Sequence, residues 1–238
     1  MGRQICDRLA TVLLWLAGIF IVALLVYFLT YILVRGLPVL DARFIFSLPR
    51  ELEAGGGVGP QLFNSFYILI LSLLFSLPVG IGAGIYLAEY ARPTRLTAVI
   101  RLSTECLATV PSIVIGLFGM IVFVNLLGLG LCILAGAATL ALLNLPVLVR
   151  VTEDALRAVP RTYREGSLAL GATRWQTIRR VVIPAASVGI VTGVTLVAGR
   201  ALGEAAVLIF TAGMSVSRFF PDLNPLAAGE TLAVHLWY

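Results

Sequence analysis

The sequence contains no lysine and only one histidine, which excludes several kinds of catalytic site. Because this single histidine, His235, is the only one available, we expect neither a His-based triad nor a multi-histidine metal site. The phosphate-binding loop G-x-x-x-x-G-K-S/T needs a lysine, so this chain is not expected to hydrolyse a nucleotide. We therefore expect no catalytic residues, no metal ligands and no cofactor in this chain.

Charge is scarce as well. Only 12% of the residues are charged and 60% are hydrophobic, with a mean hydropathy of +1.02, which favours a membrane protein over a soluble domain. All seventeen basic residues are arginines, and sixteen of them lie between apolar runs, so no nucleic-acid partner is expected. Cys6, Cys106 and Cys132 lie in or beside apolar segments without metal or disulfide spacing, and we interpret them as small membrane-buried side chains.

Uncharged runs of about 20 residues or more predict membrane spans. Leu9 to Val34 holds 26 residues without a charge. It is too long for a signal peptide and no small-residue cleavage site follows, so we interpret it as a retained anchor helix. After a polar loop over residues 36–60, Pro78 predicts a kink in the second span. Gly80 and Gly84 have the GxxxG spacing that lets another helix approach closely.

The uncharged run over residues 106–149 is too long for one span, and Asn125–Gly130 is the natural break. Arg101 and Glu105, four residues apart near the start of the third span, can pair on one helical face. The sequence therefore predicts an all-α membrane protein, a polytopic helix bundle with five complete spans plus the start of a sixth. The spans cover about residues 9–34, 62–88, 96–124, 130–149 and 184–212, and the sixth begins at about residue 230.

The loop arginines predict the orientation of these spans. Twelve lie in the N-terminal segment and in the second and fourth loops, against four in the first, third and fifth loops. By the positive-inside rule, the N-terminus and the interval over residues 150–183 are cytoplasmic.

That interval also predicts two short helices joined by a corner. Thr162 with Glu165, and Thr173 with Gln176, each fit a capping box at a helix start. Gly171 lies between them, where the first helix would end in a left-handed turn. A helix, a corner and a second helix at a membrane surface form a structure to which a partner protein can bind.

The same residues carry a motif. Glu165-Gly166-Ser167, three residues, Gly171, nine residues and Val181-x-Ile183-Pro184 resembles the EAA motif of ABC importer permeases, in which I-x-L-P ends the pattern. The exchanges are small-for-small or aliphatic and the spacing is intact. The resemblance implies a single permease domain over residues 1–238 with the type I ABC-importer permease fold, and a coupling helix that docks on a cytoplasmic ATPase. The coupling residues it implies are Glu165, Gly166, Ser167, Leu168, Gly171 and Pro184. For Glu165, capping of the helix through Thr162 and a contact to the partner both stay open.

Several stretches also resemble phosphate transport system permeases. They are Gly56–Pro60, Ile85–Tyr90, Val110–Gly119 and Arg200–Glu204, while Phe210–Met214 and Glu230–Val234 resemble the A-type subunit more than its C-type companion. The resemblance implies a multi-pass subunit that imports inorganic phosphate across a bacterial or archaeal cytoplasmic membrane. The partners it implies are a second permease subunit, a cytoplasmic ABC ATPase dimer that carries ATP and Mg, an extracytoplasmic phosphate-binding protein and membrane lipid.

Arg200 and Glu204 stand out independently of the resemblance, because they lie inside the predicted fifth span. A charge at mid-bilayer costs about 2.5–3.5 kcal/mol on insertion scales, so it persists where it is paired or used. One interpretation is a structural pair on one helical face. In the other, Arg200 offers its fork of donors to a phosphate oxyanion and Glu204 holds the guanidinium when no anion is bound.

Two alternatives to phosphate import stay open from the sequence. The same fold could serve another oxyanion, or the chain could be a proton-coupled secondary transporter in which Glu204 or Glu105 carries the proton. The cytoplasmic helix-corner-helix argues against the second alternative, because a proton-driven carrier has no ATPase to bind.

Overall fold

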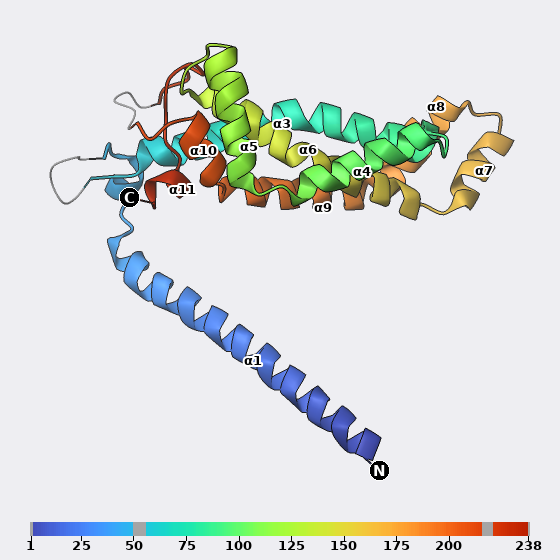
Figure 1. The fold of residues 1–238 in the computed structure, drawn as a ribbon, viewed down its shortest axis with the longest axis horizontal. Coiled ribbons are helices and arrows are strands. Elements are labelled where there is room, and N and C mark those ends of the chain that lie inside the picture. Colours follow the sequence, from blue (N-terminus) through green and yellow to red (C-terminus); the bar gives the residue numbers. More distant parts are fainter. Residues whose placement is uncertain (1, 50–55, 216–220, 238) are drawn as a thin grey trace. The chain divides into compact units, whose positions relative to one another are not determined.

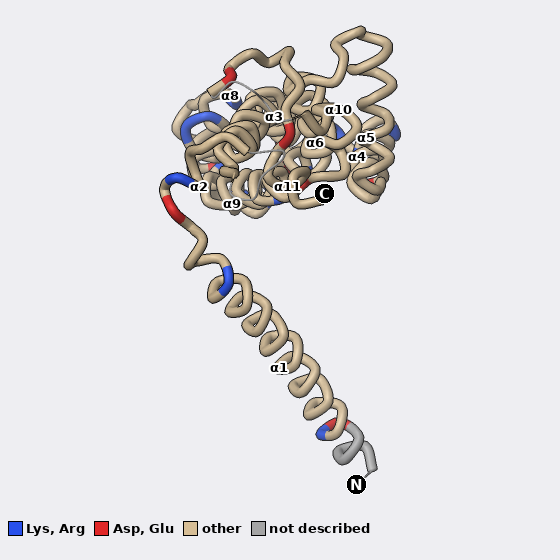
Figure 2. The backbone as a smooth tube through the Cα atoms, turned by 90° about the vertical axis from the view of Figure 1, so that its left-hand side faces the viewer, with Lys and Arg blue, Asp and Glu red and all other residues tan. Residues whose placement is uncertain are grey.

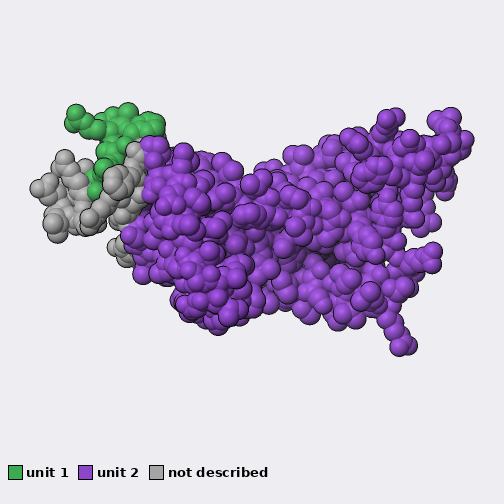
Figure 3. Space-filling model, turned by 90° about the horizontal axis from the view of Figure 1, so that it is seen from above, with its two compact units in different colours: residues 1–57 green, residues 58–238 purple. Residues whose placement is uncertain are grey.

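The computed structural model describes residues 2–49, 56–215 and 221–237, and within these ranges the chain forms helices and turns with no strand. It divides into two compact units, residues 1–57 and 58–238, which Figure 3 colours separately. The single permease domain expected over residues 1–238 stays a prediction. Each unit is described by itself below.

The first unit is dominated by α1 (Gly2–Gly36), which is followed by a 3₁₀ turn, η1 (Leu37–Val39), and by α2 (Ala42–Phe46). Charged residues occur only near the two ends of the described part of α1, and its middle is uncharged (Figure 2). The side chains between these ends are exposed, as expected for a helix whose surroundings would be lipid. Asp41 caps α2 by accepting a 2.7 Å hydrogen bond from the backbone N–H of Ala42.

The second unit is a bundle of long helices with short helices at both ends (Figure 1). The long helices α3, α4, α6 and α9 run alongside one another, α7 and α8 lie at one end, and α5, α10 and α11 lie at the other. Three π-helical segments, η2, η3 and η4, extend or join these helices. The bounds are α3 Gly59–Ile85, η2 Tyr86–Tyr90, α4 Arg95–Thr109, α5 Ser112–Gly119, η3 Met120–Leu126, α6 Ile133–Ala158, α7 Arg161–Ala169, α8 Arg174–Thr177, η4 Ile178–Val182, α9 Ile183–Leu202, α10 Ala206–Thr211 and α11 Leu232–His235.

Four of the described helical stretches are long and apolar enough to cross a membrane: Asp7–Val39, Gly59–Tyr90, Ile133–Ala158 and Arg174–Leu202. A bent pair, Arg95–Thr109 with Ser112–Leu126, makes a fifth if it counts as one span. Which of these segments cross the bilayer, and in which direction, stays a prediction.

The core of the second unit is centred on α6. Ile133, Leu140 and Leu143 are buried there together with Ile68 of α3 and Leu208 of α10. This helix contacts the other long helices of the bundle, and α10 and α5 as well. Burial of this much apolar surface against one helix makes α6 the element on which the others are assembled.

The α3–α6 interface depends on the two glycines of the GxxxG pattern. A Cβ atom at Gly80 would lie 2.7 Å from Leu148 Cβ, and one at Gly84 would lie 2.6 Å from Thr152 Cβ. Only glycine allows the two helices to come so close. The close approach predicted from the spacing is confirmed.

The third predicted span is not a straight helix. Between α4 and α5 the chain bends by 101° at Val110–Pro111. Proline cannot supply a backbone N–H and disfavours helical geometry in the residue before it; Val110 accordingly adopts an extended conformation, with φ −66° and ψ 132°. Pro111 therefore begins a new helix where the sequence placed it inside one.

Two other helix boundaries also differ from the expected ones. The helix of the predicted fourth span, α6, continues to Ala158, past residue 149 where the span was predicted to end. The charged residues that follow residue 149 pair along the helix surface, Arg157 with Glu153 at 2.8 Å and Arg150 with Asp154 at 3.9 Å. The helix of the predicted fifth span, α9, stops at Leu202, short of the predicted end at residue 212, and a new helix, α10, begins at Ala206. The break before α6 lies where the sequence predicted it, with Gly128 and Gly130 at φ +67° and +71°.

Candidate functional site

The helix-corner-helix lies at one end of the second unit, and its corner has the predicted geometry. Gly171 adopts φ +82°, a left-handed conformation that favours glycine. Thr173 and Gln176 form the predicted capping box, with Thr173 N–H donating to Gln176 Oε1 at 2.9 Å and Gln176 N–H donating to Thr173 Oγ1 at 3.3 Å. The corner and the start of α8 are thus fixed by local sequence.

The first predicted capping box is wrong. α7 begins at Arg161, one residue before the expected cap, and its N-cap residue is Pro160, which makes no side-chain capping bond. Proline disfavours helical geometry in the residue before it, and Val159 is extended with φ −66° and ψ 126°, so α6 ends there and a new helix begins directly after Pro160. Thr162 lies inside the helix, so Glu165 does not cap it.

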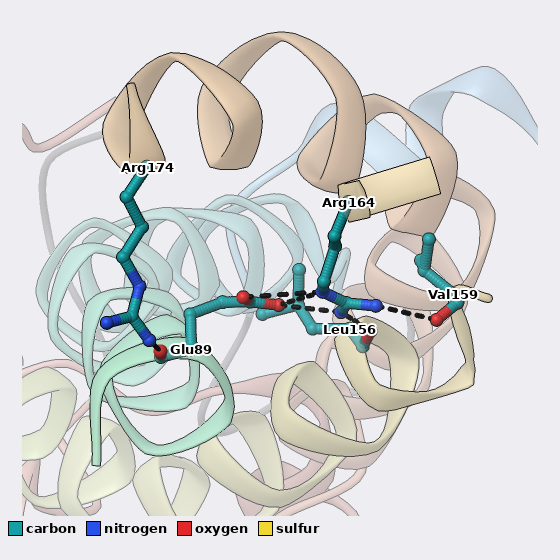
Figure 4. A network of polar contacts seen from close by, with 5 residues as sticks. All are labelled: Glu89, Leu156, Val159, Arg164 and Arg174. Carbon is teal, nitrogen blue, oxygen red and sulfur yellow. Dashed lines mark hydrogen bonds and ion pairs between the residues drawn. The ribbon is translucent and has the colours of Figure 1, made fainter. Parts of the chain in front are cut away.

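An arginine that the sequence did not single out connects α7 to the long helices (Figure 4). Arg164 forms a salt bridge with Glu89 of η2, in which Nη2 lies 2.6 Å and Nε 3.1 Å from Oε1. Its Nη2 also donates to Leu156 O and its Nη1 to Val159 O, both at 2.7 Å. The side chains of Arg164 and Glu89 are 21% and 9% exposed, so the pair is shielded from most of the solvent that weakens surface ion pairs.

Glu89 is held from the other arm of the corner as well. Arg174, the first residue of α8, donates a hydrogen bond from Nη2 to the backbone carbonyl of Glu89. Its guanidinium carbon lies 4.9 Å from the ring centre of Tyr90, a distance that suits a cation–π contact. Both helices of the corner therefore contact the same short π-helical segment.

A second set of ion pairs fixes α4 to α6 near the same end. Arg101 pairs with Glu153 at 2.9 Å and donates to Leu87 O at 3.2 Å, and Glu105 accepts from Arg150 at 3.0 Å. The predicted pairing of Arg101 with Glu105 is wrong, because each side chain finds an opposite charge on the neighbouring helix. These pairs lie around a pocket of about 180 Å³.

The coupling residues expected from the motif lie on or beside α7, with different exposures. Leu168 is 49% exposed and Glu165 and Gly166 are exposed, while Ser167 is partly buried and its hydroxyl lies 3.0 Å from that of Thr177. Pro184 occupies the first turn of α9, where proline is tolerated. No residue of α7 is buried, and Tyr163 and Leu170 add further exposed apolar surface.

The two charged residues expected in the pathway are not paired with each other. Arg200 is exposed near the end of α9, and its side chain makes no hydrogen bond or ion pair with any residue that the structure describes. Glu204 lies beyond the end of α9, so the expected positions four apart on one helical face do not exist. Its Oε1 accepts instead from the N–H of Val207 at 3.4 Å, in the first turn of α10.

Glu89 and Arg164 are the residues that sequence reasoning missed. Both stand in stretches with a recognisable motif, but they are 75 residues apart. The only signal in the sequence was a carboxylate, Glu89, just before a turn that holds Arg92 and Arg95, and it gave no indication of its partner.

Comparison with known proteins defines the class. The sequence matches the family described as "Binding-protein-dependent transport system inner membrane component" over residues 80–224. It resembles a chain of the MetNI methionine ABC transporter in an inward-facing conformation, with a TM-score of 0.58 and 23% sequence identity over 64% of this chain and 74% of that one. The chain belongs to the ABC importer permease family, the multi-pass membrane subunits of binding-protein-dependent transporters.

Individual relatives within this family show which permeases the chain resembles. The chain is 47% identical over 247 residues to "Probable ABC transporter permease protein YqgI" of Bacillus subtilis, covering 100% of this chain and 84% of that protein. It is 36% identical over 226 residues to "Phosphate transport system permease protein PstA" of Pasteurella multocida, covering 94% and 80%. It is also 35% identical over 247 residues to the protein of the same description in Yersinia pestis, covering 97% and 83%. The resemblance to phosphate transport system permeases is confirmed.

Proposed function

We propose that this chain is the permease subunit of an ATP-driven importer of inorganic phosphate. Family membership decides between the two classes of transporter weighed from the sequence, in favour of the ABC permease over the proton-coupled carrier. Several relatives named as phosphate transport system permeases support the substrate.

The observation that carries the choice of an anionic substrate is Arg200. Its guanidinium lies exposed on a helix apolar enough to span the membrane, with no acceptor among the residues that the structure describes. An arginine in a span is costly unless it is paired or used. A phosphate oxyanion would supply the missing acceptors, because one guanidinium can hold two of its oxygens at once.

Glu204 takes a different role from the one first expected. Its carboxylate accepts from the first turn of α10, where a negative charge is favoured by the helix dipole. We propose that Glu204 fixes the start of α10 and so shapes the wall of the substrate pathway beside Arg200. Loss of its charge should therefore affect transport less than loss of the guanidinium fork.

The coupling role belongs to α7 and the corner. We propose that Glu165, Gly166, Ser167 and Leu168 meet the cytoplasmic ATPase dimer, while Gly171 and Pro184 fix the course of the chain. Support comes from the absence of any buried residue in α7 and from the exposed Tyr163, Leu168 and Leu170. Exposed apolar side chains at a cytoplasmic surface are a feature of protein interfaces. The other proposed partners are a second permease subunit and an extracytoplasmic phosphate-binding protein.

The test is uptake of labelled phosphate by the assembled complex. Arg200→Lys should lose most uptake, because an ammonium is a point charge that cannot hold two oxygens in a planar fork. Glu204→Gln should retain more. The matched control is Arg95→Lys, since Arg95 is also exposed but stands at the start of α4 in a predicted cytoplasmic turn. Uptake is normalised to the amount of complex, and full uptake by Arg200→Lys would refute a substrate contact.

A further inference from the structure

The coupling helix has few attachments to the rest of the molecule. No side chain of α7 is buried. Its chain connections are Val159–Pro160 on one side and the Gly171 corner on the other. The hydroxyl contact between Ser167 and Thr177 leads to α8, and α7 also packs against η4; both belong to the helical stretch Arg174–Leu202, which continues as α9. Among the long helices, these contacts attach α7 to α9.

Arg164 adds an attachment to the ends of α3 and α6. Its guanidinium reaches three acceptors at once: the Glu89 carboxylate and the carbonyls of Leu156 and Val159. The carbonyls belong to the last turn and the C-cap of α6, where helix carbonyls lack the usual α-helical partner; that of Leu156 also accepts from the N–H of Val159 at 3.3 Å. A planar fork with five N–H donors can serve such a set, and an ammonium cannot match its geometry.

The acceptors stand on two helices that are themselves packed tightly together. Glu89 lies in η2, the continuation of α3, and α3 meets α6 at Gly80 and Gly84 without room for a Cβ atom. Close-packed interfaces of this kind transmit displacement, because they have little free volume to absorb it. A guanidinium bound to the ends of both helices is therefore bound to one stiff unit.

Glu89 is also the point at which the two arms of the corner meet. Its carboxylate is bound by Arg164 of α7, and its carbonyl accepts from Arg174 of α8 (Figure 4). The corner is thus attached to the end of α3 through one residue, on both sides of Gly171.

We propose that Arg164 is a positioning residue that clamps the coupling helix to the ends of α3 and α6 through Glu89, Leu156 and Val159. Displacement of α7 is then delivered to both long helices through one guanidinium. The inference rests on the proposed function, because it assumes that an ATPase binds α7 and that ATP hydrolysis displaces this helix. The clamp itself is a property of this chain alone and can be tested without transport.

The first test is hydrogen exchange of the full-length chain in lipid nanodiscs. In Arg164→Lys and in Glu89→Gln, we expect the amides of residues 161–169 to exchange about tenfold faster, since each variant loses a charge-assisted bond or leaves a shielded charge without its partner. The matched control is Arg161→Lys, a variant of an exposed arginine on the same helix that makes no hydrogen bond or ion pair with the described residues. Unchanged exchange in the first two variants, or equal acceleration in the control, would overturn the clamp.

A charge exchange separates a clamp from a simple ion pair. In the double variant Glu89→Arg with Arg164→Glu, opposite charges face each other again, but the carbonyls of Leu156 and Val159 have lost their donor. We expect protection of α7 to stay low in this variant. Full recovery of protection would show that the ion pair alone holds the helix.

The second test measures coupling in the assembled complex. Arg164→Lys should retain the ATPase, because the exposed face of α7 is unchanged, but should import at least threefold less phosphate for each ATP hydrolysed. An unchanged ratio together with a loosened α7 would overturn the transmission role and leave the proposed function intact. If the parent chain itself bound no ATPase, the proposed function would fail, and the exchange data would still decide whether the clamp exists.

Discussion

The sharpest prediction about packing concerns Gly84, one of the two glycines at the contact between α3 and α6. In Gly84→Ala the new Cβ would lie 2.6 Å from Thr152 Cβ, 2.8 Å from its Cγ2 and 3.0 Å from the carbonyl oxygen of Val149. The carbonyl belongs to helical backbone and cannot turn aside, so α3 and α6 must separate. Gly82 is the matched control, because a Cβ there meets nothing within 4 Å.

The expected magnitude follows from comparing the two variants. Each replaces a helical glycine by alanine, which favours the helix by about 1 kcal/mol, so this gain cancels in the comparison. What remains is the cost of forcing extra volume into a packed interface, about 1–3 kcal/mol. For a chain of this size each kcal/mol corresponds to about 2–4 °C in Tm, so Gly84→Ala should melt about 2–12 °C below Gly82→Ala.

The assay is thermal unfolding of the full-length subunit in detergent, followed by tryptophan fluorescence. Gly82→Ala should unfold at or above the Tm of the parent protein. If the two alanine variants unfolded at the same temperature, the helices would not meet at Gly84, and the stiff α3–α6 unit on which the clamp acts would be refuted.

Two further predictions concern orientation and coupling. For orientation, Cys6, Cys106 and Cys132 are first replaced, and single cysteines are introduced at Ser47 and at Ser167. The two should react with an impermeant reagent from opposite sides of a sealed membrane, because twelve of the loop arginines lie on one side of the predicted topology. Reaction of both from the same side would show that the topology is wrong. In Gly171→Pro, the corner loses a left-handed φ of +82° and the N–H that donates to Leu168 O at 2.9 Å, and Leu168→Pro interrupts α7 itself. Both should leave the chain inserted but reduce uptake for each ATP hydrolysed by about tenfold or more, and a normal ratio in both would remove the docking role from α7.

Features specified within a few residues were predictable from the sequence. The corner at Gly171 and the capping box of Thr173 with Gln176 depend on bonds that close within one helical turn. The GxxxG spacing predicted a close approach, although it could not say that α6 would be the partner. The start of α7 was misjudged because Pro160 offers a competing helix start two residues before Thr162.

Contacts between distant parts of the chain were not predictable in this way. Arg101 and Glu105 have the right spacing to pair with each other, yet both pair with α6, because packing places Glu153 and Arg150 within reach. The Glu89–Arg164 pair depends likewise on the meeting of η2 and α7, which no local pattern encodes. The expected helical pair of Arg200 and Glu204 failed because the helix ends between them.

The most direct measurement of the proposed function is ATP-driven uptake into proteoliposomes, using the complex purified from its native membrane through this chain. Labelled phosphate and labelled sulfate are offered separately, each with and without ATP, and the co-purified proteins are identified. We predict that an ATPase and an extracytoplasmic binding protein co-purify, and that phosphate accumulates only with ATP. Accumulation of sulfate in place of phosphate would contradict the substrate, and ATP-independent phosphate uptake driven by a proton gradient would contradict the mechanism.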